Sequence, residues 1–371
     1  MKMSRVVPTP RGVKYYDFAD DLAAYPEAWL YVVWSRRGPG KTYSSLLDAA
    51  QHDKKIVYMK RTNDDVKILT STVGGISMSP YAPINRDFGT DIRLVPVYMT
   101  TASGNRGIMD GIAAIVPYTD GGERMDDELG VVMSLNKIKS YKGFDLSTID
   151  EIIFDEFMPQ PGEQTKRKEG EMLLSFYMTA NRDRVARGLP EIKLVLYGNP
   201  DSIWCPITLT LDLVDTMTDM EASGTRELYD ERRRIFYRSI DYSASITEDM
   251  GIVAAMRGTQ WGRAALEGEF SYIDKSAIRR TPLNKYSPVC GISWMNKYYY
   301  VYAHKSSGEL YMCSSRAPGV DVYNLDEERD QRRYWLDYGI DFRQAVVDHA
   351  MYFQSYTMYN IVFNFTSLFK V

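Results

Sequence analysis

A loop with two glycines and a lysine has the composition of a phosphate-binding site. It reads Ser35-Arg36-Arg37-Gly38-Pro39-Gly40-Lys41-Thr42, follows the apolar run of residues 28–34 and precedes a helix-like segment that starts at residue 43. Glycines let backbone amides turn toward phosphate oxygens, lysine adds positive charge, and the threonine hydroxyl is a ligand for Mg²⁺. The general pattern has glycine in place of Ser35, so an ordinary strand-to-helix turn is the alternative. The order strand, loop, helix favours a nucleotide site formed by Gly38, Pro39, Gly40, Lys41 and Thr42.

Two adjacent carboxylates end another apolar run. Residues 152–154 are continued by Asp155 and Glu156. There, Asp155 would hold the water shell of Mg²⁺ and Glu156 would polarise the attacking water during ATP hydrolysis. Alone, such a pair is better explained as a helix cap or a solvated turn. ATP hydrolysis needs both motifs at the carboxyl ends of parallel strands, where open α/β sheets bind ligands, so together they predict an ATPase site.

Two weaker signals lie further along the chain. The apolar run of residues 194–198 ends at Asn199, whose amide would orient the catalytic water or sense the γ-phosphate. A simple turn is equally open, because Gly-Asn-Pro favours one. Arg182, Arg184 and Arg187 lie near the end of a helix-like stretch. Arginine neutralises phosphoryl charge in the transition state, often from a neighbouring subunit; the alternative is a solvated, partly self-paired helix face.

Composition excludes several other classes of protein. The chain has 371 residues, a net charge of −4 and 44% hydrophobic residues, so it has no global basic footprint of a nucleic-acid-coating protein. Three isolated cysteines and three scattered histidines do not support a disulfide framework or a zinc site. The first eleven residues contain no apolar core of signal-peptide length, and no segment approaches about 18 uninterrupted apolar residues. We therefore expect a protein that is neither secreted by the usual route nor a membrane protein.

The pattern of apolar runs predicts an α/β fold in three parts. Residues 1–205 contain short apolar runs alternating with helix-like segments, which predicts a mainly parallel sheet, with a hairpin over 91–118 and a turn at Asp110-Gly111. Residues 206–280 form a small connecting or lid subdomain with an acidic helix over 209–222 and a strand over 232–242. Residues 281–371 begin as an antiparallel meander and continue with helices over 327–338 and 342–353.

The order of these motifs resembles that of the DNA-packaging (encapsidation) ATPases of small tailed bacteriophages. These are related to the large terminase subunits and to the additional-strand, catalytic-glutamate ring ATPases with a P-loop. The matching strings are Arg37-Gly38-x-Gly40-Lys41-Thr42 for the family's R-G-x-G-K-[ST], Ile153-Phe154-Asp155-Glu156-Phe157 for V-F-D-E-F, and Asn181-Arg182-Asp183-Arg184-Val185 for N-R-E-R-V. With Asn199 after the next strand, the resemblance covers most of the chain with gaps.

The resemblance implies a role for each matching residue. Lys41 and Thr42 would bind phosphate and Mg²⁺, Asp155 would be the metal carboxylate, Glu156 the catalytic base, and Arg37 would contact the nucleotide or a lid. The family arginine that acts in trans aligns with Ala180, so Arg182 or Arg184 would take its role, and Lys139 matches a lysine that reaches a neighbour's nucleotide.

The resemblance also implies partners. It describes a ring, a pentamer, that uses ATP to move double-stranded DNA into a procapsid through its portal (connector) in the host cytoplasm, with packaging RNA as a further partner. Lys166, Arg167 and Lys168 match basic residues that grip DNA phosphates in the pore. A basic triplet is otherwise a solvated loop, but several subunits in a ring supply enough cations for a salt-sensitive grip without a basic pI.

The C-terminal part resembles the RNase H-like nuclease domain of the terminases. A two-metal nuclease needs clustered carboxylates, beginning with an aspartate on the first strand, and residues 289–294 contain none. The resemblance therefore implies a nuclease-dead docking domain. Two other functions stay open for the chain: a P-loop helicase or remodelling ATPase, and a structural protein with a degenerate nucleotide pocket, for which Ser35 is the best evidence.

Overall fold

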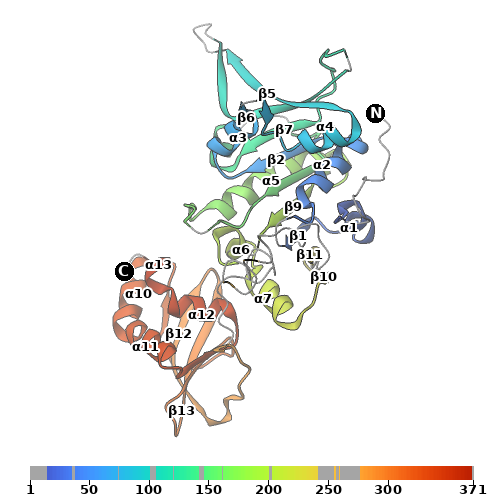
Figure 1. The fold of residues 1–371 in the computed structure, drawn as a ribbon. Coiled ribbons are helices and arrows are strands. Elements are labelled where there is room, and N and C mark those ends of the chain that lie inside the picture. The colour runs from blue at the N-terminus through green and yellow to red at the C-terminus, as the bar shows by residue number, and fades with distance from the viewer. Residues whose placement is uncertain are drawn as a thin grey trace. The chain divides into compact units, whose positions relative to one another are not determined.

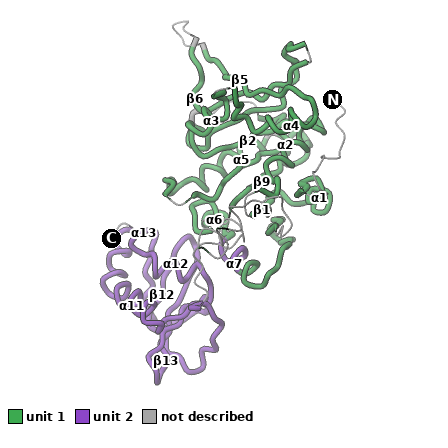
Figure 2. The backbone as a smooth tube through the Cα atoms, in the orientation of Figure 1, with its two compact units in different colours: residues 1–213, 219–271 green, residues 214–218, 272–371 purple. Residues whose placement is uncertain are grey.

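The computed structural model describes most of the chain. The described residues are 15–35, 38–73, 75–100, 106–119, 121–141, 146–160, 162–199, 203–240, 255, 259 and 276–369. They form two compact units, one comprising residues 1–213 and 219–271 and the other residues 214–218 and 272–371 (Figure 2). Among the helices of these described ranges, none combines the length and the apolar character needed to cross a bilayer.

The first unit is built on a nine-stranded sheet (Figure 1). Its strands are β1 (Leu30–Ser35), β2 (Ile56–Lys60), β5 (Asp91–Thr100), β6 (Arg106–Tyr118), β7 (Gly130–Ser134), β8 (Glu151–Asp155), β9 (Lys193–Gly198), β10 (Glu227–Asp230) and β11 (Ile235–Ile240). They follow the order β10-β11-β1-β9-β8-β2-β7-β6-β5, and the six from β11 to β7 are parallel. β9 therefore separates the strand before the glycine loop from the strand that ends in Asp155.

Helices follow the strands of this unit as the sequence pattern predicts. They are α1 (Phe18–Ala24), α2 (Lys41–Gln51), α3 (Asn63–Leu69), α4 (Ala82–Phe88), the 3₁₀ segment η2 (Leu135–Tyr141), α5 (Glu169–Ala186), α6 (Pro206–Thr210) and α7 (Val214–Ser223), with a two-stranded ribbon of β3 (Thr72–Val73) and β4 (Ile76–Ser77). Thr62 begins α3 with a capping box, in which its hydroxyl and the Asp65 carboxylate exchange hydrogen bonds with each other's backbone N–H. Local sequence signals thus account for where these elements start.

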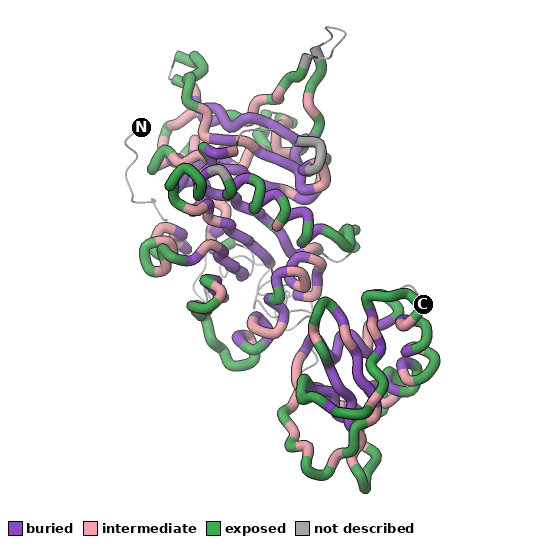
Figure 3. Tube along the Cα trace, turned by 180° about the vertical axis from the view of Figure 1, so that it is seen from behind, coloured by how far each residue is buried: buried purple, intermediate pink, exposed green. Residues whose placement is uncertain are grey.

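The core of the first unit lies against the central strands. β1 and β8 are buried at every residue, as expected for parallel strands covered on both faces (Figure 3). On one face, side chains of the strands pack against apolar side chains of α1, α2 and α4. Members of that cluster include Phe18, Tyr31, Val33, Leu46, Leu47, Ile84, Ile153, Val195 and Phe236. This packing fixes the strand ends at which the site residues lie.

Three features of the first unit differ from the sequence prediction. β11 pairs in parallel with β1, so residues up to 240 extend the main sheet and the unit does not end at residue 205. The predicted helix over 209–222 is two helices, because Asp212 adopts a left-handed conformation with φ of 53° between them. Asp110-Gly111 is no turn: Gly111, at φ of 79°, lies within β6 near the irregularity in its pairing with β5.

The second unit contains a mixed five-stranded sheet followed by helices. The sheet order is β15-β12-β13-β14-β16, with an antiparallel meander of β12 (Tyr286–Trp294), β13 (Lys297–His304) and β14 (Leu310–Cys313). β15 (Val322–Asn324) pairs in parallel with β12, and β16 (Met351–Phe353) with β14. The remaining elements are η5 (Leu283–Lys285), α10 (Glu328–Tyr334), the π-helical η6 (Trp335–Gly339), α11 (Ile340–Val347), α12 (Tyr356–Phe363) and α13 (Phe365–Leu368).

This arrangement confirms the predicted α/β class of the C-terminal part. Two details differ from the prediction. The first two predicted helices are joined through η6 into one helical run, and residues 351–353, assigned to the second of them, form an edge strand instead. Position in the sheet overrides the local helical spacing there, because Met351 and Phe353 are buried against β14.

Candidate functional site

The glycine loop and the ends of β8 and β9 line one cavity of about 420 Å³. Because β1, β9 and β8 are parallel neighbours, their carboxyl ends meet at one edge of the sheet. The residues that line the cavity are Gly38, Pro39, Gly40, Lys41, Thr42, Tyr43, Pro80, Pro83, Asp155, Glu156, Tyr197 and Asn199. The structure therefore brings together the three motifs that the sequence separates by more than 150 positions.

Lys41 lies at the first position of α2, directly after the loop. Gly40 precedes it at φ of 89°, a left-handed conformation that favours glycine, and a Cβ there would approach a ring carbon of Tyr15 to 3.2 Å. The Lys41 ammonium donates hydrogen bonds to the Ser35 hydroxyl at 2.5 Å and to the Asn199 side-chain oxygen at 3.2 Å. Ser35, the departure from the general loop pattern, is thus a partner of the lysine.

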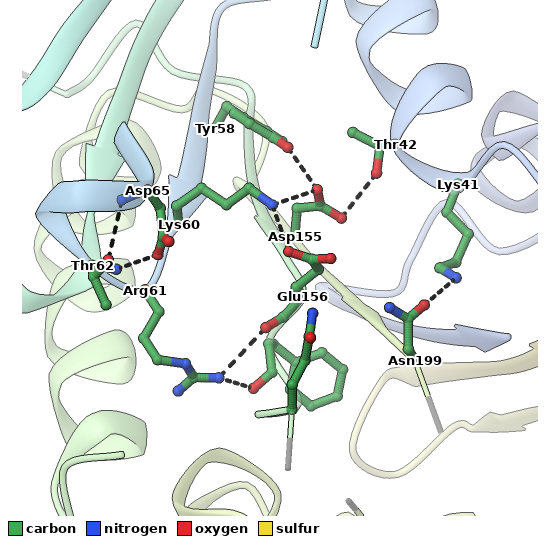
Figure 4. Close-up of polar contacts among 12 residues, drawn as sticks. Lys41, Thr42, Tyr58, Lys60, Arg61, Thr62, Asp65, Asp155, Glu156 and Asn199 are labelled. Atoms are coloured by element: carbon green, nitrogen blue, oxygen red, sulfur yellow. Dashed lines mark hydrogen bonds and ion pairs between the residues drawn. The ribbon is translucent and has the colours of Figure 1, made fainter. Parts of the chain in front are cut away.

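Asp155 is the polar centre of the site (Figure 4). One carboxylate oxygen accepts a hydrogen bond from the Thr42 hydroxyl at 2.9 Å, and the other accepts from the Tyr58 hydroxyl at 2.6 Å and from the Lys60 ammonium at 3.0 Å. Burial by itself raises the pKa of Asp155, but the charge of Lys60 and these three hydrogen bonds outweigh it and lower the pKa. Asp155 is therefore ionised at neutral pH.

Glu156 leaves β8 in a strained conformation. Its φ is 58°, in the left-handed region that costs a non-glycine residue about 1–3 kcal/mol and is retained where surrounding contacts impose it. The next residue, Phe157, donates its N–H to the Tyr197 carbonyl at 3.0 Å, which ties this exit to β9. The Glu156 carboxylate is about half exposed, lines the cavity and pairs with Lys60 at 3.0 Å.

Thr42 and Asp155 fit a Mg²⁺ ion. Their oxygen atoms are hydrogen-bonded to each other and both residues line the cavity next to the loop. Hydroxyl and carboxylate oxygens are the ligands that Mg²⁺ takes in nucleotide sites. The cavity, the loop amides and this pair together have the components of a Mg²⁺–nucleotide site.

The structure places the other predicted residues away from this cavity or leaves them undescribed. Arg37 lies outside the described residues, as does the side chain of Lys139, whose backbone belongs to η2. Arg182 is exposed on α5. The basic triplet is exposed in the segment just before α5, and consists of Lys166, Arg167 and Lys168.

Arg184 is buried at the opposite edge of the sheet. Its guanidinium donates to the carbonyls of Pro190 at 2.8 Å and Ser147 at 3.2 Å and pairs with Asp150 at 3.1 Å. Each of the three guanidinium nitrogens thus has an acceptor within the chain, and the side chain is only 7% exposed. This placement argues against Arg184 as a finger reaching another subunit and leaves Arg182 as the candidate.

Two functional residues escaped the sequence reasoning. Tyr58 and Lys60 lie two positions apart at the end of β2, and both bond to Asp155. Burial by itself lowers the pKa of Lys60, but Asp155 and Glu156 outweigh it and raise the pKa, so the ammonium stays charged. The signal was present, because a lysine ends the apolar run of residues 56–59, but which strand neighbours β8 could not be read from the sequence.

Two solved structures share this fold over nearly the whole chain. "The bacteriophage Phi-29 viral genome packaging motor assembly" has a TM-score of 0.61 and 16% sequence identity, covering 96% of this chain and 99% of that chain. "The Phi-28 gp11 DNA packaging Motor" has a TM-score of 0.59 and 16% identity, covering 96% and 98%. No protein-family model matches the chain, and no curated protein matches it. The fold is thus that of packaging-motor subunits.

Proposed function

We propose that this chain is the ATPase subunit of a viral genome-packaging motor, which hydrolyses ATP with Mg²⁺ to move double-stranded DNA into a procapsid. The observation that carries the proposal is the convergence of Lys41, Thr42, Asp155, Glu156 and Asn199 on one cavity. The similarity to packaging-motor structures supports the choice of this motor among P-loop ATPases.

Each residue of the cavity has a distinct part in hydrolysis. The loop amides and Lys41 hold the phosphates, and Thr42 and Asp155 hold Mg²⁺, which neutralises the charge that develops on the transferred phosphoryl group. Glu156 polarises the attacking water, which requires its carboxylate to be released from Lys60. Asn199, already bonded to Lys41, orients the water or senses the γ-phosphate.

The motor acts as a ring, a pentamer, at the portal of a procapsid in the host cytoplasm. Arg182, exposed on α5, reaches the nucleotide of a neighbouring subunit, and Lys139 contributes at the same interface, while Arg37 contacts the nucleotide or a lid. The exposed segment with Lys166, Arg167 and Lys168 grips DNA phosphates in the pore. The C-terminal unit docks on the portal or on packaging RNA.

The direct test is ATP hydrolysis by the purified chain with and without double-stranded DNA. We expect DNA-stimulated, Mg²⁺-dependent turnover, and Lys41→Ala should weaken ATP binding about 10- to 100-fold because a charge-assisted contact to phosphate is lost. Arg86→Lys, at an exposed position on α4, is the control. Retained turnover in Lys41→Ala would overturn the proposed site.

The same assay separates the alternative functions. Stimulation by single-stranded DNA or RNA in place of double-stranded DNA indicates a helicase. Binding of ATP without hydrolysis under every condition indicates a structural protein with a degenerate pocket.

We also propose that the C-terminal unit does not cut DNA. β12, the first strand of its sheet, carries no Asp or Glu between residues 286 and 294, whereas a two-metal nuclease needs an aspartate there. Incubation of supercoiled plasmid with the purified chain and Mg²⁺ or Mn²⁺ should leave it intact. Metal-dependent cleavage that persists in Glu156→Gln would contradict this expectation.

A further inference from the structure

Three apolar side chains lie exposed on the two-stranded ribbon of the first unit. All four residues of β3 and β4 are exposed. Val73 pairs with Ile76 directly across the ribbon, and the Met78 N–H donates to the Ser71 carbonyl at 3.2 Å, which continues the same register. Residues directly opposite each other, and those two positions further along, point to one face. Val73, Ile76 and Met78 therefore form an apolar surface, the ribbon face, in which they are 60%, 66% and 40% exposed.

The ribbon face adjoins the nucleotide cavity along the chain. One residue separates Met78 from Pro80, which lines the cavity together with Pro83. Consecutive Cα atoms are about 3.8 Å apart, so the Cα atoms of Met78 and Pro80 are separated by no more than about 8 Å. The ribbon face therefore begins beside the wall of the cavity.

The composition of the ribbon face indicates what kind of partner covers it. A two-stranded ribbon is marginally stable by itself, and neighbouring apolar side chains that are exposed mark surfaces that another molecule covers. Aliphatic side chains offer neither charge nor a hydrogen bond to the phosphates of a nucleic acid. The ribbon face is therefore suited to an apolar protein surface.

A surface of matching character lies on the outer side of α5. Met178 is 66% exposed and Val185 is 58% exposed. They lie four residues before and three residues after Arg182, spacings that place all three on one side of the helix. At 1.5 Å per residue, Met178 lies about 6 Å and Val185 about 4.5 Å from Arg182 along the helix axis. We call these three residues the α5 stripe: an exposed arginine between two exposed apolar side chains.

The ribbon face and the α5 stripe are different surfaces of one chain, as a ring requires. In a cyclic ring, each copy presents one surface to the copy before it and another to the copy after it. If Arg182 of one copy enters the cavity of its neighbour, Met178 and Val185 lie within about 6 Å of that cavity's rim. The wall at Pro80 continues into the ribbon face, so contact there removes apolar surface of both copies from water.

We propose that the ribbon face is the docking surface for the α5 stripe of a neighbouring copy of this chain. Docking places Arg182 at the neighbour's nucleotide cavity, so each ATP site is complete only after this contact has formed. The inference rests on the proposed function, because it takes Arg182 as the residue that acts between subunits.

Cysteine cross-linking tests the contact directly. Met178→Cys and Ile76→Cys chains are purified separately, mixed with ATP, Mg²⁺ and double-stranded DNA, and treated with a short bismaleimide. The three cysteines of the chain are buried, which keeps the background low. We expect a covalent dimer in the mixture and in neither variant alone. Met125→Cys, at an exposed methionine outside the ribbon, is the control and should give no dimer with Met178→Cys.

Substitution by charged residues separates a docking role from a structural one. Ile76→Asp and Met178→Lys should each raise the dissociation constant of the ring about tenfold, because a charge is left without a partner in the contact. Both side chains are exposed, so thermal unfolding of the dissociated chain should stay as in the wild type. A chain with both substitutions should recover the wild-type dissociation constant within about threefold, since opposite charges then meet across the contact. Analytical ultracentrifugation measures assembly, and Met125→Asp is the control.

ATP turnover should follow assembly. In Ile76→Asp, turnover per subunit should rise with protein concentration toward the wild-type value, whereas a structural defect lowers it equally at every concentration. A ring that forms without the cross-link between positions 178 and 76, or single variants that assemble like the wild type, overturns the docking surface. A wild-type ring that forms the cross-link but hydrolyses no ATP rejects the proposed function and keeps the docking surface. A wild-type chain that stays monomeric with ATP and DNA overturns both.

Discussion

The two edges of the first unit's sheet both gather charged residues, yet only one of them has the form of a reactive site. At the carboxyl edge, Asp155, Lys60 and Lys41 border a cavity. At the amino edge, Lys54 bridges the buried Asp48 and Glu151, and Arg184 pairs with Asp150. Charge clusters therefore do not identify a site by themselves, because those at the amino edge pair with one another within the fold.

Strand β8 shows the physical difference along a single segment. Glu151 begins the strand and Asp155 ends it. Burial raises the pKa of Glu151 to about 6 although Lys54 opposes it, whereas Lys60, Tyr58 and Thr42 hold the pKa of Asp155 below its usual value. The surroundings of Asp155 favour an ionised carboxylate, while those of Glu151 make its ionisation costly.

The largest predicted effect is that of Glu156→Gln at the carboxyl edge. Loss of the general base should lower kcat by about 10² to 10⁴-fold while ATP binding and thermal stability are retained, because the carboxylate is about half exposed and Lys60 keeps its ion pair with Asp155. Steady-state hydrolysis measures the fall in kcat, and nucleotide titration measures the retained ATP binding. Turnover in the variant equal to that of the wild type would show that the carboxyl edge is not the reactive one.

The next effect concerns Arg182, on the exposed side of α5. Arg182→Ala should lower turnover about 10³-fold if the arginine stabilises phosphoryl charge in a neighbouring subunit. Mixing Arg182→Ala with Glu156→Gln subunits should then restore hydrolysis at interfaces that pair an intact arginine with an intact glutamate. Absence of recovery in the mixed sample argues against an intersubunit site.

Arg184→Ala tests the amino edge as a purely structural region. Removal of the guanidinium takes a hydrogen-bond donor from the carbonyls of Ser147 and Pro190, so the free energy of unfolding should fall by about 2 kcal/mol. Mixing Arg184→Ala with Glu156→Gln subunits should give no more turnover than the Arg184→Ala subunits give alone. Chemical denaturation measures the first part; an unchanged stability with a large loss of turnover would reverse our assignment of Arg182 and Arg184.

The smallest effect is a pH dependence from Glu151. Its folded pKa of about 6 lies above the unfolded value, so the folded state binds more protons and stability gains as pH falls from 7 to 5. The gain attributable to this group is about 1 kcal/mol, and it disappears as pH rises through the folded pKa. Denaturation at both pH values should show this difference between the wild type and Glu151→Gln. A parallel response of both proteins would contradict it.

Local signals predicted the elements of the site better than its boundaries and partners. The apolar runs before Asp155 and Asn199 and the loop before Lys41 all became neighbouring strand ends. Tyr58 and Lys60 were not recognised, because their hydrogen bonds to Asp155 arise from β2 lying beside β8. The limit of the first unit was set too early, since the pairing of β11 with β1 joins residues more than 200 positions apart.

The sequence by itself determined the chemistry that this protein can offer: a glycine loop with Lys41 and Thr42, a strand ending in two carboxylates, and arginines on a later helix. Residue type and short spacing suffice for that, because backbone geometry links such neighbours directly. Only the tertiary structure decided which charged side chains border the cavity and which are paired within the fold. It buried Arg184, exposed Arg182 and tied Arg61 to the segment after Glu156. Burial and pairing arise from contacts between distant strands, and those contacts set whether a charge is free to act on a ligand.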